Sequence, residues 1–260
     1  MLISFDYLIK KYNLKITGLS HFGAHTGQEV DLYLKNNITN IHLFEPQRKI
    51  FNQLIKIYKE KKNLSFYNFG LGSKNMKVKI NLDTAESQSS SILKPKTHLL
   101  LHQNIKFEGT EDIEIKIYDD LKIKEVNFLN IDVQGYELEA LIGCKNSLKS
   151  IDYIYTEINS QEVYQDCPLV SDLDRFLLNF GFSRVETRWF DNLAWGDAFY
   201  IKNEFLSKSD FIKVKIKNFI FSFTTTKYIE IKKIKLFNYL KKVFYKFKQF
   251  IKKKIKNIFN

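Results

Sequence analysis

The sequence predicts an α/β fold in which helices cover both faces of a mostly parallel β-sheet. Short apolar runs of strand length alternate with longer segments whose apolar residues recur every three or four positions. Several of the runs end on a glycine, a proline or a carboxylate, and a helical pattern begins directly afterwards. Because a helix that connects two neighbouring strands makes them parallel, this alternation predicts a parallel sheet.

The first half of the chain supplies three strands and the helices between them. The expected strands cover residues 15–22, 41–44 and 64–69. The expected helices cover residues 3–12, from the turn at 23–27 to about 35, and 48–61. In the last of these helices Ile50, Leu54 and Tyr58 recur at helical spacing, which gives the helix one apolar face.

The alternation breaks between residues 77 and 117. Val78, Ile80 and Leu82 alternate with polar residues, and a second alternating run follows at 113–117. Both runs are typical of strands that bury one face. They flank a loop over 83–110, and loops of this length are usually functional or disordered.

The second half returns to the parallel pattern. Apolar strands are expected over 128–131 and 152–158, the first ending on Asp132 and the second near Glu157. Between them, Gly135 allows a tight turn and begins a helix. A later helix is expected to start at Ser171 with Asp174 at its third position, and to end at Gly181. Strands over 184–190 and 198–201, joined by 191–197, then predict a hairpin.

Charge divides the chain into a near-neutral body and a basic tail. Residues 205–260 carry 16 Lys and two acids, +14, while residues 1–204 carry 25 Lys and Arg against 27 acids, −2, which gives the total of +12. The two cysteines are too few for a disulfide framework or a cysteine zinc site. With no signal-peptide pattern and no apolar run long enough to cross a membrane, we expect a cytoplasmic location.

The tail has the pattern of an amphipathic helix. From Ile231 onward the apolar and aromatic residues recur at steps of three and four, and lysines occupy the other faces. This pattern is typical of a helix that lies on an anionic membrane surface, here at the inner face of the membrane. Packing against its own domain or a homodimer partner, and binding to nucleic acid, remain alternatives. The preceding stretch, 211–223, alternates like a strand.

A glycine turn and a distant carboxylate predict a nucleotide-type site. Gly23 and Gly27 follow the first strand and open a helix, so backbone N–H groups can approach a ligand closely. Glu45 lies 22 residues beyond Gly23 at the end of the next strand, where an acid commonly binds the ribose hydroxyls. The turn lacks the G-x-G-x-x-G spacing of nicotinamide enzymes, which disfavours that class.

Six motifs occur in order between Gly18 and Lys202: GAHTGQE, FEP, SSSIL, YDDL, IDVQGYE and DAFYI. In this order they closely resemble the FkbM-type methyltransferases, which use S-adenosylmethionine to methylate hydroxyl groups, commonly on sugars and polyketides. The resemblance implies a class I methyltransferase-like, Rossmann-type fold with a seven-stranded, mostly parallel sheet and one reversed strand late in the chain. It also implies a methyltransferase domain over 1–204, followed by the tail at 205–260, and an acceptor hydroxyl on a sugar or a lipid-linked glycan.

The motifs and the strand ends together give the candidate site residues, although the resemblance does not settle which acid is the base. Those expected to bind the donor are His21, Gly23, Ala24, His25, Gly27, Glu45, Gly70, Leu71 and Asp132. Asp132 and Glu157 are the expected catalytic residues, with His25 and His98 as other candidate bases. No metal is assigned, although the two acids could instead position the donor or hold a divalent ion together with Asp119.

The residues that contact the acceptor are less clearly indicated by the sequence. Ser89, Ser90 and Ser91 match the serine run of the family and are either donor or acceptor contacts or a polar loop. Trp189, Trp195 and Asp197 lie where acceptors usually approach this fold, although tryptophan more often has a packing role.

His21 stands where family members usually carry an acid. A weakly active or non-catalytic binding protein is therefore the first alternative, and a nucleic-acid methyltransferase is the second.

Overall fold

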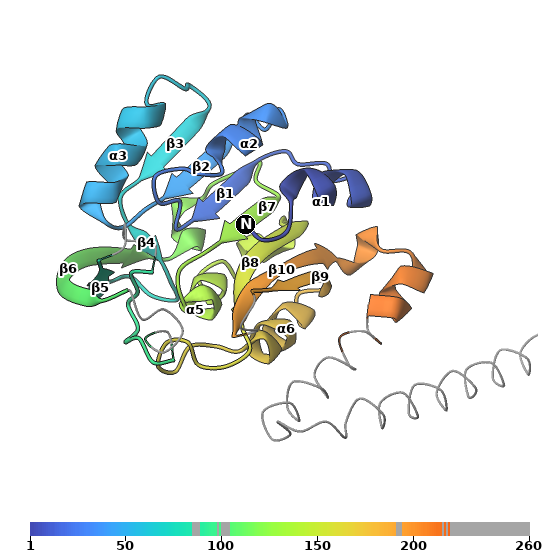
Figure 1. The fold of residues 1–260 in the computed structure, drawn as a ribbon. Helices are drawn as coiled ribbons and strands as arrows, with labels where there is room; N and C mark the ends of the chain where they lie inside the picture. The colour runs from blue at the N-terminus through green and yellow to red at the C-terminus, as the bar shows by residue number, and fades with distance from the viewer. Residues whose placement is uncertain are drawn as a thin grey trace, which may run out of the picture. The chain divides into compact units, whose positions relative to one another are not determined.

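A seven-stranded sheet with the order β3-β2-β1-β7-β8-β10-β9 forms the centre of the fold (Figure 1). Neighbouring strands from β3 to β8 pair in parallel, whereas β10 is antiparallel to both β8 and β9. The strands are β1 (Leu19–Phe22), β2 (Ile41–Phe44), β3 (Leu64–Tyr67), β7 (Phe128–Ile131), β8 (Tyr153–Asn159), β9 (Phe182–Trp189) and β10 (Trp195–Lys202). The predicted fold class, including the single reversed strand, is confirmed.

These strands belong to a computed structural model that describes residues 1–84, 89–97, 99, 105–190, 194–214, 216 and 218. The chain divides into two units, Met1–Lys215 and Ile216–Asn260. Most of the second unit, with the predicted amphipathic tail helix, lies outside the described residues. None of the helices in the described part of the chain is long and apolar enough to cross a membrane.

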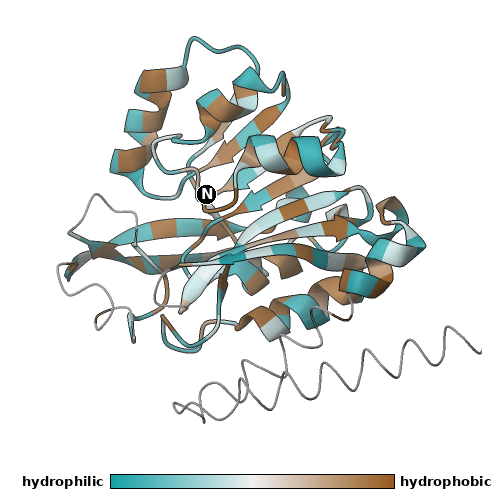
Figure 2. Cartoon of the chain, turned by 45° about the vertical axis from the view of Figure 1, so that its right-hand side comes forward, coloured by the Kyte–Doolittle hydropathy of each residue, from teal (hydrophilic) through white to brown (hydrophobic). Residues whose placement is uncertain are grey.

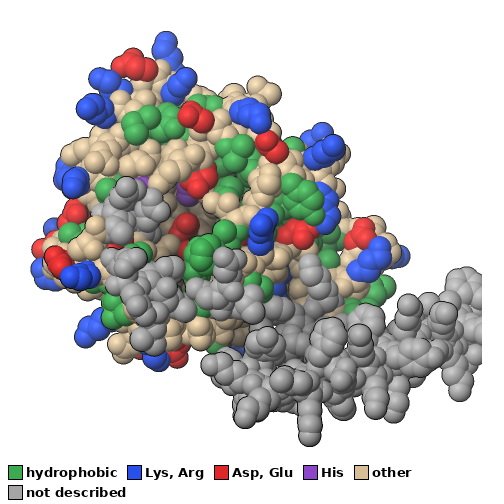
Figure 3. Space-filling model, in the orientation of Figure 1, with side chains coloured by type: hydrophobic (Ala, Val, Ile, Leu, Met, Phe, Trp, Pro, Cys, Tyr) green, Lys and Arg blue, Asp and Glu red, His purple; other side chains and the backbone are tan. Residues whose placement is uncertain are grey.

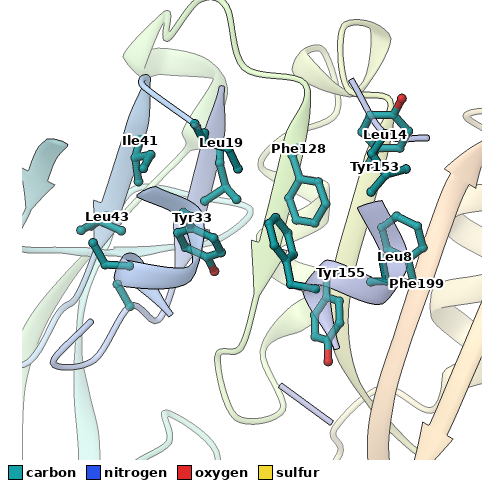
Figure 4. Close-up of a cluster of buried hydrophobic side chains, with 14 of the residues drawn as sticks. Leu8, Leu14, Leu19, Tyr33, Ile41, Leu43, Phe128, Tyr153, Tyr155 and Phe199 are labelled. Carbon is teal, nitrogen blue, oxygen red and sulfur yellow. The ribbon is translucent and has the colours of Figure 1, made fainter. Parts of the chain in front are cut away.

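Helices lie on both faces of the sheet, as predicted. They are α1 (Phe5–Tyr12), α2 (Val30–Lys35), α3 (Arg48–Tyr58), α5 (Glu137–Ile142) and α6 (Val170–Leu178). The first three contribute to one buried cluster that includes Leu19, Tyr33, Phe128 and Phe199 (Figure 4). The helices α5 and α6 contact each other and β8, and none of their residues belongs to that cluster. Figure 2 shows hydrophobic and hydrophilic residues alternating along the helices, as expected for helices that bury one side.

The interruption between residues 70 and 117 forms a separate three-stranded sheet of order β4-β6-β5. Its strands are β4 (Gly70–Leu71), β5 (Met76–Asp83) and β6 (Phe107–Lys116). The two alternating strands were predicted, but β6 begins at Phe107, inside the expected loop over 83–110. Their inward residues Ile80, Ile113 and Ile115 form a buried cluster of their own. The two-residue strand β4 was not predicted, because two residues are too few to show periodicity.

Two local predictions are wrong. The helix α6 begins at Val170, so Ser171 is not its cap; instead the Asp172 carboxylate accepts the N–H of Leu169 at 2.9 Å. The expected strand over 211–223 is helical at the described residues 208–214. There the Ser207 hydroxyl accepts the N–H of Asp210 at 3.1 Å, and this local cap favours a helix over the weak alternation of the sequence.

Candidate functional site

A cavity of about 540 Å³ opens at the carboxyl ends of β1, β2, β7 and β8. Figure 3 shows it as a hollow near the centre of one face, with acidic and histidine side chains beside it. Most of the predicted site residues line it: His21, Gly23, His25, Glu45, Gly70, Leu71, Asp132 and Glu157. The structure therefore brings together groups that lie up to 136 positions apart in the sequence.

The glycine turn after β1 packs directly against the end of β7. Gly23 has a φ of 80°, and a Cβ at this position would lie 1.8 Å from the backbone oxygen of Asp132. The N–H groups of Gly23 and Ala24 donate to the Phe44 carbonyl at 3.0 and 2.9 Å. Ala24 and Gly27 do not belong to the cavity wall formed by the described residues. These two residues shape the turn and do not contact a ligand in the cavity. At Gly27 a side chain is excluded, because a Cβ there would overlap Leu54.

The Glu45 carboxylate is fixed by two backbone N–H groups. Its Oε2 accepts from His25 at 3.0 Å and its Oε1 accepts from Gln47 at 2.8 Å. Burial raises the pKa of this carboxyl to about 7, and the two hydrogen bonds oppose that rise. Each carboxylate oxygen can accept more than one hydrogen bond, so a pair of ligand hydroxyls could still be accepted from the cavity.

His21 is buried and uncharged at neutral pH. Its Nε2 lies 3.0 Å from Asn130 Nδ2 and its Nδ1 lies 3.3 Å from the Tyr33 hydroxyl. Asn130 Nδ2 also donates to that hydroxyl at 2.7 Å, which closes a buried triangle of polar groups. Burial lowers the pKa of His21 to about 4. The residue that replaces the usual acid of the family therefore brings no negative charge to the cavity.

Asp132 and Glu157 are joined by one side chain. Gln134 Nε2 donates to Asp132 Oδ1 at 2.7 Å and to Glu157 Oε2 at 2.9 Å. Asp132 is exposed, and its carboxylate faces the cavity while protein surrounds it on the other sides. This surrounding protein, and secondarily the charge of Asp197, raises the pKa of Asp132 to about 6. Burial, followed by the nearby Asp132, raises the pKa of Glu157 well above its usual value. With a pKa of about 6, Asp132 is mostly ionised at pH 7, whereas burial and the charge of Asp132 disfavour ionisation of Glu157.

Glu137 has a structural role behind this pair. Its carboxylate accepts the N–H groups of Gly135 at 2.9 Å and Val133 at 3.3 Å, so it holds the turn that carries Gln134. Gln134 itself adopts a φ of 51°, a left-handed conformation that is costly for a residue with a side chain. The hydrogen bonds of Gln134 and Glu137 offset that cost.

Residues of β10, the second strand of the late hairpin, form one wall of the cavity. Asp197 pairs with Glu157 across β10 and β8, and its carboxylate accepts from the Tyr155 hydroxyl. Trp195 is a lining residue of the cavity and packs against the buried cluster of Val163, Tyr164, Cys167 and Ala194. Its ring stacks on Phe190, with centroids 4.7 Å apart and an interplanar angle of 15°. Of the two predicted tryptophans, Trp195 lies on the cavity wall and Trp189 is not among the described lining residues.

The serine run connects the loop to the turn that carries Gln134. Ser89 and Ser90 line the cavity, and the Ser91 hydroxyl donates to the Gln134 carbonyl at 2.6 Å. The Tyr164 hydroxyl lies 2.9 Å from the Ser89 carbonyl and 2.8 Å from Gln134 Oε1. The serines therefore hold the loop against the turn that carries Gln134, whatever ligand contacts they also make.

Other candidates are placed outside the site. The Asp119 carboxylate accepts the N–H groups of Asn146 at 2.7 Å and Ser147 at 2.9 Å, and Asp119 does not line the cavity. It therefore cannot share a divalent ion with Asp132 and Glu157 in this arrangement. No group of three potential metal ligands occurs among residues that the structure describes. His98 and His102 lie outside the described residues.

Sequence reasoning missed Gln134 and Tyr155. Gln134 lies inside the motif IDVQGYE, but its importance depends on a left-handed backbone and on Tyr164, 30 positions away. The sequence around a turn residue before a glycine does not show which side chains it will hydrogen-bond in the folded protein. Tyr155 belongs to an apolar strand, where a tyrosine ordinarily suggests only packing.

The strand order, the single antiparallel strand and the ligand edge at β1 and β2 together define a class I methyltransferase fold. Within that class, residues 21–184 match the family described as "Methyltransferase FkbM domain". The chain belongs to the FkbM methyltransferase family, as the motifs predicted.

Individual relatives match over shorter stretches. The chain is 35% identical over 91 residues to 2-O-methyltransferase NoeI of Sinorhizobium fredii, which covers 33% of this chain and 37% of that protein. The chain thus spans little more than a third of this relative.

Among solved structures, an FkbM methyltransferase from Methylobacillus flagellatus is similar with a TM-score of 0.49 and 15% identity, over 71% of this chain and 43% of that one. The magnesium protoporphyrin IX methyltransferase of Synechocystis with bound SAM is similar with a TM-score of 0.42 and 10% identity. That match covers 76% of this chain and 75% of the other.

Proposed function

We propose that the protein transfers a methyl group from S-adenosylmethionine to a hydroxyl of a sugar or glycan. The observation that carries this proposal is that Glu45, Asp132 and Glu157 line the same cavity, at the ends of neighbouring strands. In open α/β sheets, ligands bind at this edge. The relative NoeI is named as an O-methyltransferase, which supports a hydroxyl acceptor.

The chemistry of the cavity wall fits the donor. Glu45 would bind its two ribose hydroxyls, and the backbone around Gly23 would lie beside its amino-acid end. Five acids line the cavity, namely Glu29, Glu45, Asp132, Glu157 and Asp197, and no Lys or Arg is among its described lining residues. Such a wall favours a cationic donor. When bound, S-adenosylmethionine supplies a methyl group on a positively charged sulfonium.

Asp132 is the general base in this proposal. Its carboxylate would accept the proton that the acceptor hydroxyl loses as the oxygen attacks the methyl carbon. Gln134 holds the carboxylate in place, and burial together with the charge of Asp132 disfavours ionisation of Glu157, which makes Asp132 the base of the pair. A base with a pKa of about 6 is mostly ionised at neutral pH and still accepts a proton readily.

The test of this function is labelled methyl transfer. The protein is incubated with S-adenosylmethionine that carries a deuterated methyl group and with a panel of methyl pyranosides and oligosaccharides. Mass spectrometry is expected to find the labelled methyl group on a hydroxyl oxygen. Calorimetry that shows no binding of S-adenosylmethionine would contradict the proposal outright.

We also propose, from the sequence pattern alone, that the tail brings the enzyme to an anionic membrane surface, where a lipid-linked acceptor could be methylated. The full-length protein is expected to cosediment with vesicles that contain anionic lipid, and to be released as salt rises. Neutral vesicles are the control.

The truncation for this test should end after Lys215 rather than after Glu204. Phe205 packs on Tyr153 with centroids 5.9 Å apart, and Leu206 and Val214 pack against the main core, so a shorter protein would lose packing. The 1–215 protein is expected to lose vesicle binding and to keep its donor affinity. Vesicle binding that is absent from the full-length protein would assign the tail to another role.

A further inference from the structure

One buried amide stands out beside the cavity. Asn159 is 1% exposed, and neither its Nδ2 nor its Oδ1 has a hydrogen-bond partner among the residues that the structure describes. In the described part of the chain, Asn159 alone has fully buried side-chain polar atoms that lack a hydrogen-bond partner. Because a buried amide without partners lowers stability, its retention calls for a compensating role.

The position of Asn159 places it next to the acceptor side of the site. It is the last residue of β8, two positions after Glu157, so both side chains project from the same face of the sheet. Asn159 is also directly opposite Trp195 in the antiparallel pairing of β8 with β10, and Glu157 is opposite Asp197. Glu157, Asp197 and Trp195 all line the cavity, and Asn159 is the fourth member of this two-by-two group, although it is not itself among the described lining residues.

This group has the composition of a sugar subsite. The Trp195 ring, supported by its stacking on Phe190, is a flat apolar surface of the kind that packs on a pyranose ring. An amide can accept a hydrogen bond from one hydroxyl through Oδ1 and donate to a second through Nδ2. Two neighbouring hydroxyls of a sugar would satisfy both atoms of Asn159 at once.

The charge of the cavity limits what the subsite can take. Its five acids face no Lys or Arg among the described lining residues, and only Glu29 has an ion pair, with the N-terminal ammonium of Met1 at 3.5 Å, so the ionised acids that remain would repel a phosphate or carboxylate on the acceptor. An uncharged ring meets no such barrier.

We propose that Asn159 is an acceptor-binding residue, which together with Trp195 binds an uncharged sugar ring through two neighbouring hydroxyls. This inference rests on the proposed function and adds to it a specificity-determining residue and the charge of the acceptor. Because Asn159 is only 1% exposed in the ligand-free protein, the Trp195 side chain must move before a sugar ring can reach it.

The substitution Asn159→Leu separates a binding role from a structural one. Leucine has the same number of side-chain heavy atoms and the same branching but no polar group, so it removes the unpaired amide, although its two methyl groups are larger than the amide oxygen and nitrogen. The melting temperature is expected to rise by about 2–4 °C, because a buried polar group without partners is lost. Donor affinity, measured by calorimetry, is expected to stay within about twofold of the parent.

Asn127→Leu is the matched control. Asn127 is also buried, but its side chain accepts from Thr17 at 2.9 Å and donates to Lys15 and Asp152, both at 2.8 Å. The same substitution there breaks three hydrogen bonds. It is expected to lower the melting temperature by about 2–4 °C or more and to leave sugar binding unchanged.

Sugar binding is measured by saturation-transfer NMR with S-adenosylhomocysteine present, using methyl pyranosides of glucose, galactose, mannose and rhamnose as probes. The parent and Asn159→Ala, a second variant in case leucine does not fit, are tested beside Asn159→Leu. At least one pyranoside is expected to bind the parent and to bind both Asn159 variants about tenfold or more weakly. Glucose 1-phosphate is expected not to bind.

Three results would overturn the inference: unchanged pyranoside binding by the Asn159 variants, no pyranoside binding by the parent, or equal binding of glucose 1-phosphate and methyl glucoside. Donor binding by calorimetry distinguishes these failures from failure of the proposed function. A parent that binds the donor but no pyranoside contradicts the subsite alone, whereas a parent that binds no donor contradicts the function.

Discussion

Replacing Asp132 with asparagine is expected to lower the turnover number by about 100-fold or more. The amide keeps the shape of the side chain and can still contact Gln134, but it cannot take a proton from the acceptor hydroxyl. The measurement is methyl transfer under saturating donor and acceptor, with circular dichroism to show that the fold is intact.

The pH profile distinguishes a base from a purely positional carboxylate. Because the pKa of Asp132 is raised to about 6, the ionised form is lost as pH falls through 6, and the turnover of the parent should fall with it. The residual turnover of Asp132→Asn should not show this step. A variant that turns over at nearly the parent rate would transfer the role of base to Glu157 or His25, or show that no base is needed.

Replacing Glu45 with alanine is expected to weaken donor binding by about 1–3 kcal/mol, which corresponds to roughly 5- to 150-fold. The substitution leaves two ribose hydroxyls without their acceptor, and it also frees the N–H groups of His25 and Gln47. Calorimetry with S-adenosylmethionine at pH 8 is the measurement. At that pH Glu45 is mostly ionised in the parent, since burial raises its pKa to about 7.

Glu60→Ala is the matched control for this experiment. The Glu60 side chain is 88% exposed and does not line the cavity, so its removal should leave donor affinity unchanged. Equal affinity of Glu45→Ala and the parent would show that the ribose binds elsewhere. A parallel melting curve checks that the loss of two capped N–H groups has not unfolded the turn.

The neutral His21, hydrogen-bonded to Asn130 and Tyr33, affects the expected affinity for the donor. A neutral histidine cannot attract the ammonium group of the donor as an acid would, yet four ionisable carboxyls remain within the same cavity besides Glu45. The measured donor affinity of the parent therefore reports directly on whether Glu29, Asp132 or Asp197 compensates for the missing charge. A donor affinity too weak to detect would favour the non-catalytic alternative.

Much of the fold could be predicted because its signals are local. The apolar strand that ends on Asp132, the turn at Gly23 and the acid at Glu45 each depend on residues within a few positions of one another. Parallel strands place such ends at one edge, so the same local signals also located most of the cavity wall. The errors at Ser171 and at 211–223 arose where two local patterns competed and a nearby hydroxyl or carboxylate capped a helix instead.

The sequence by itself determined the family, the fold class and which residues meet at the ligand edge of the sheet. The tertiary structure decided how those residues act: Gln134 joins Asp132 to Glu157, Asp119 caps a distant turn, and Asn159 has an unpaired amide beside Trp195. The physical reason is that periodicity and turn chemistry are set by neighbours in the chain. Hydrogen-bond partners and pKa shifts are set instead by groups that only folding brings within reach.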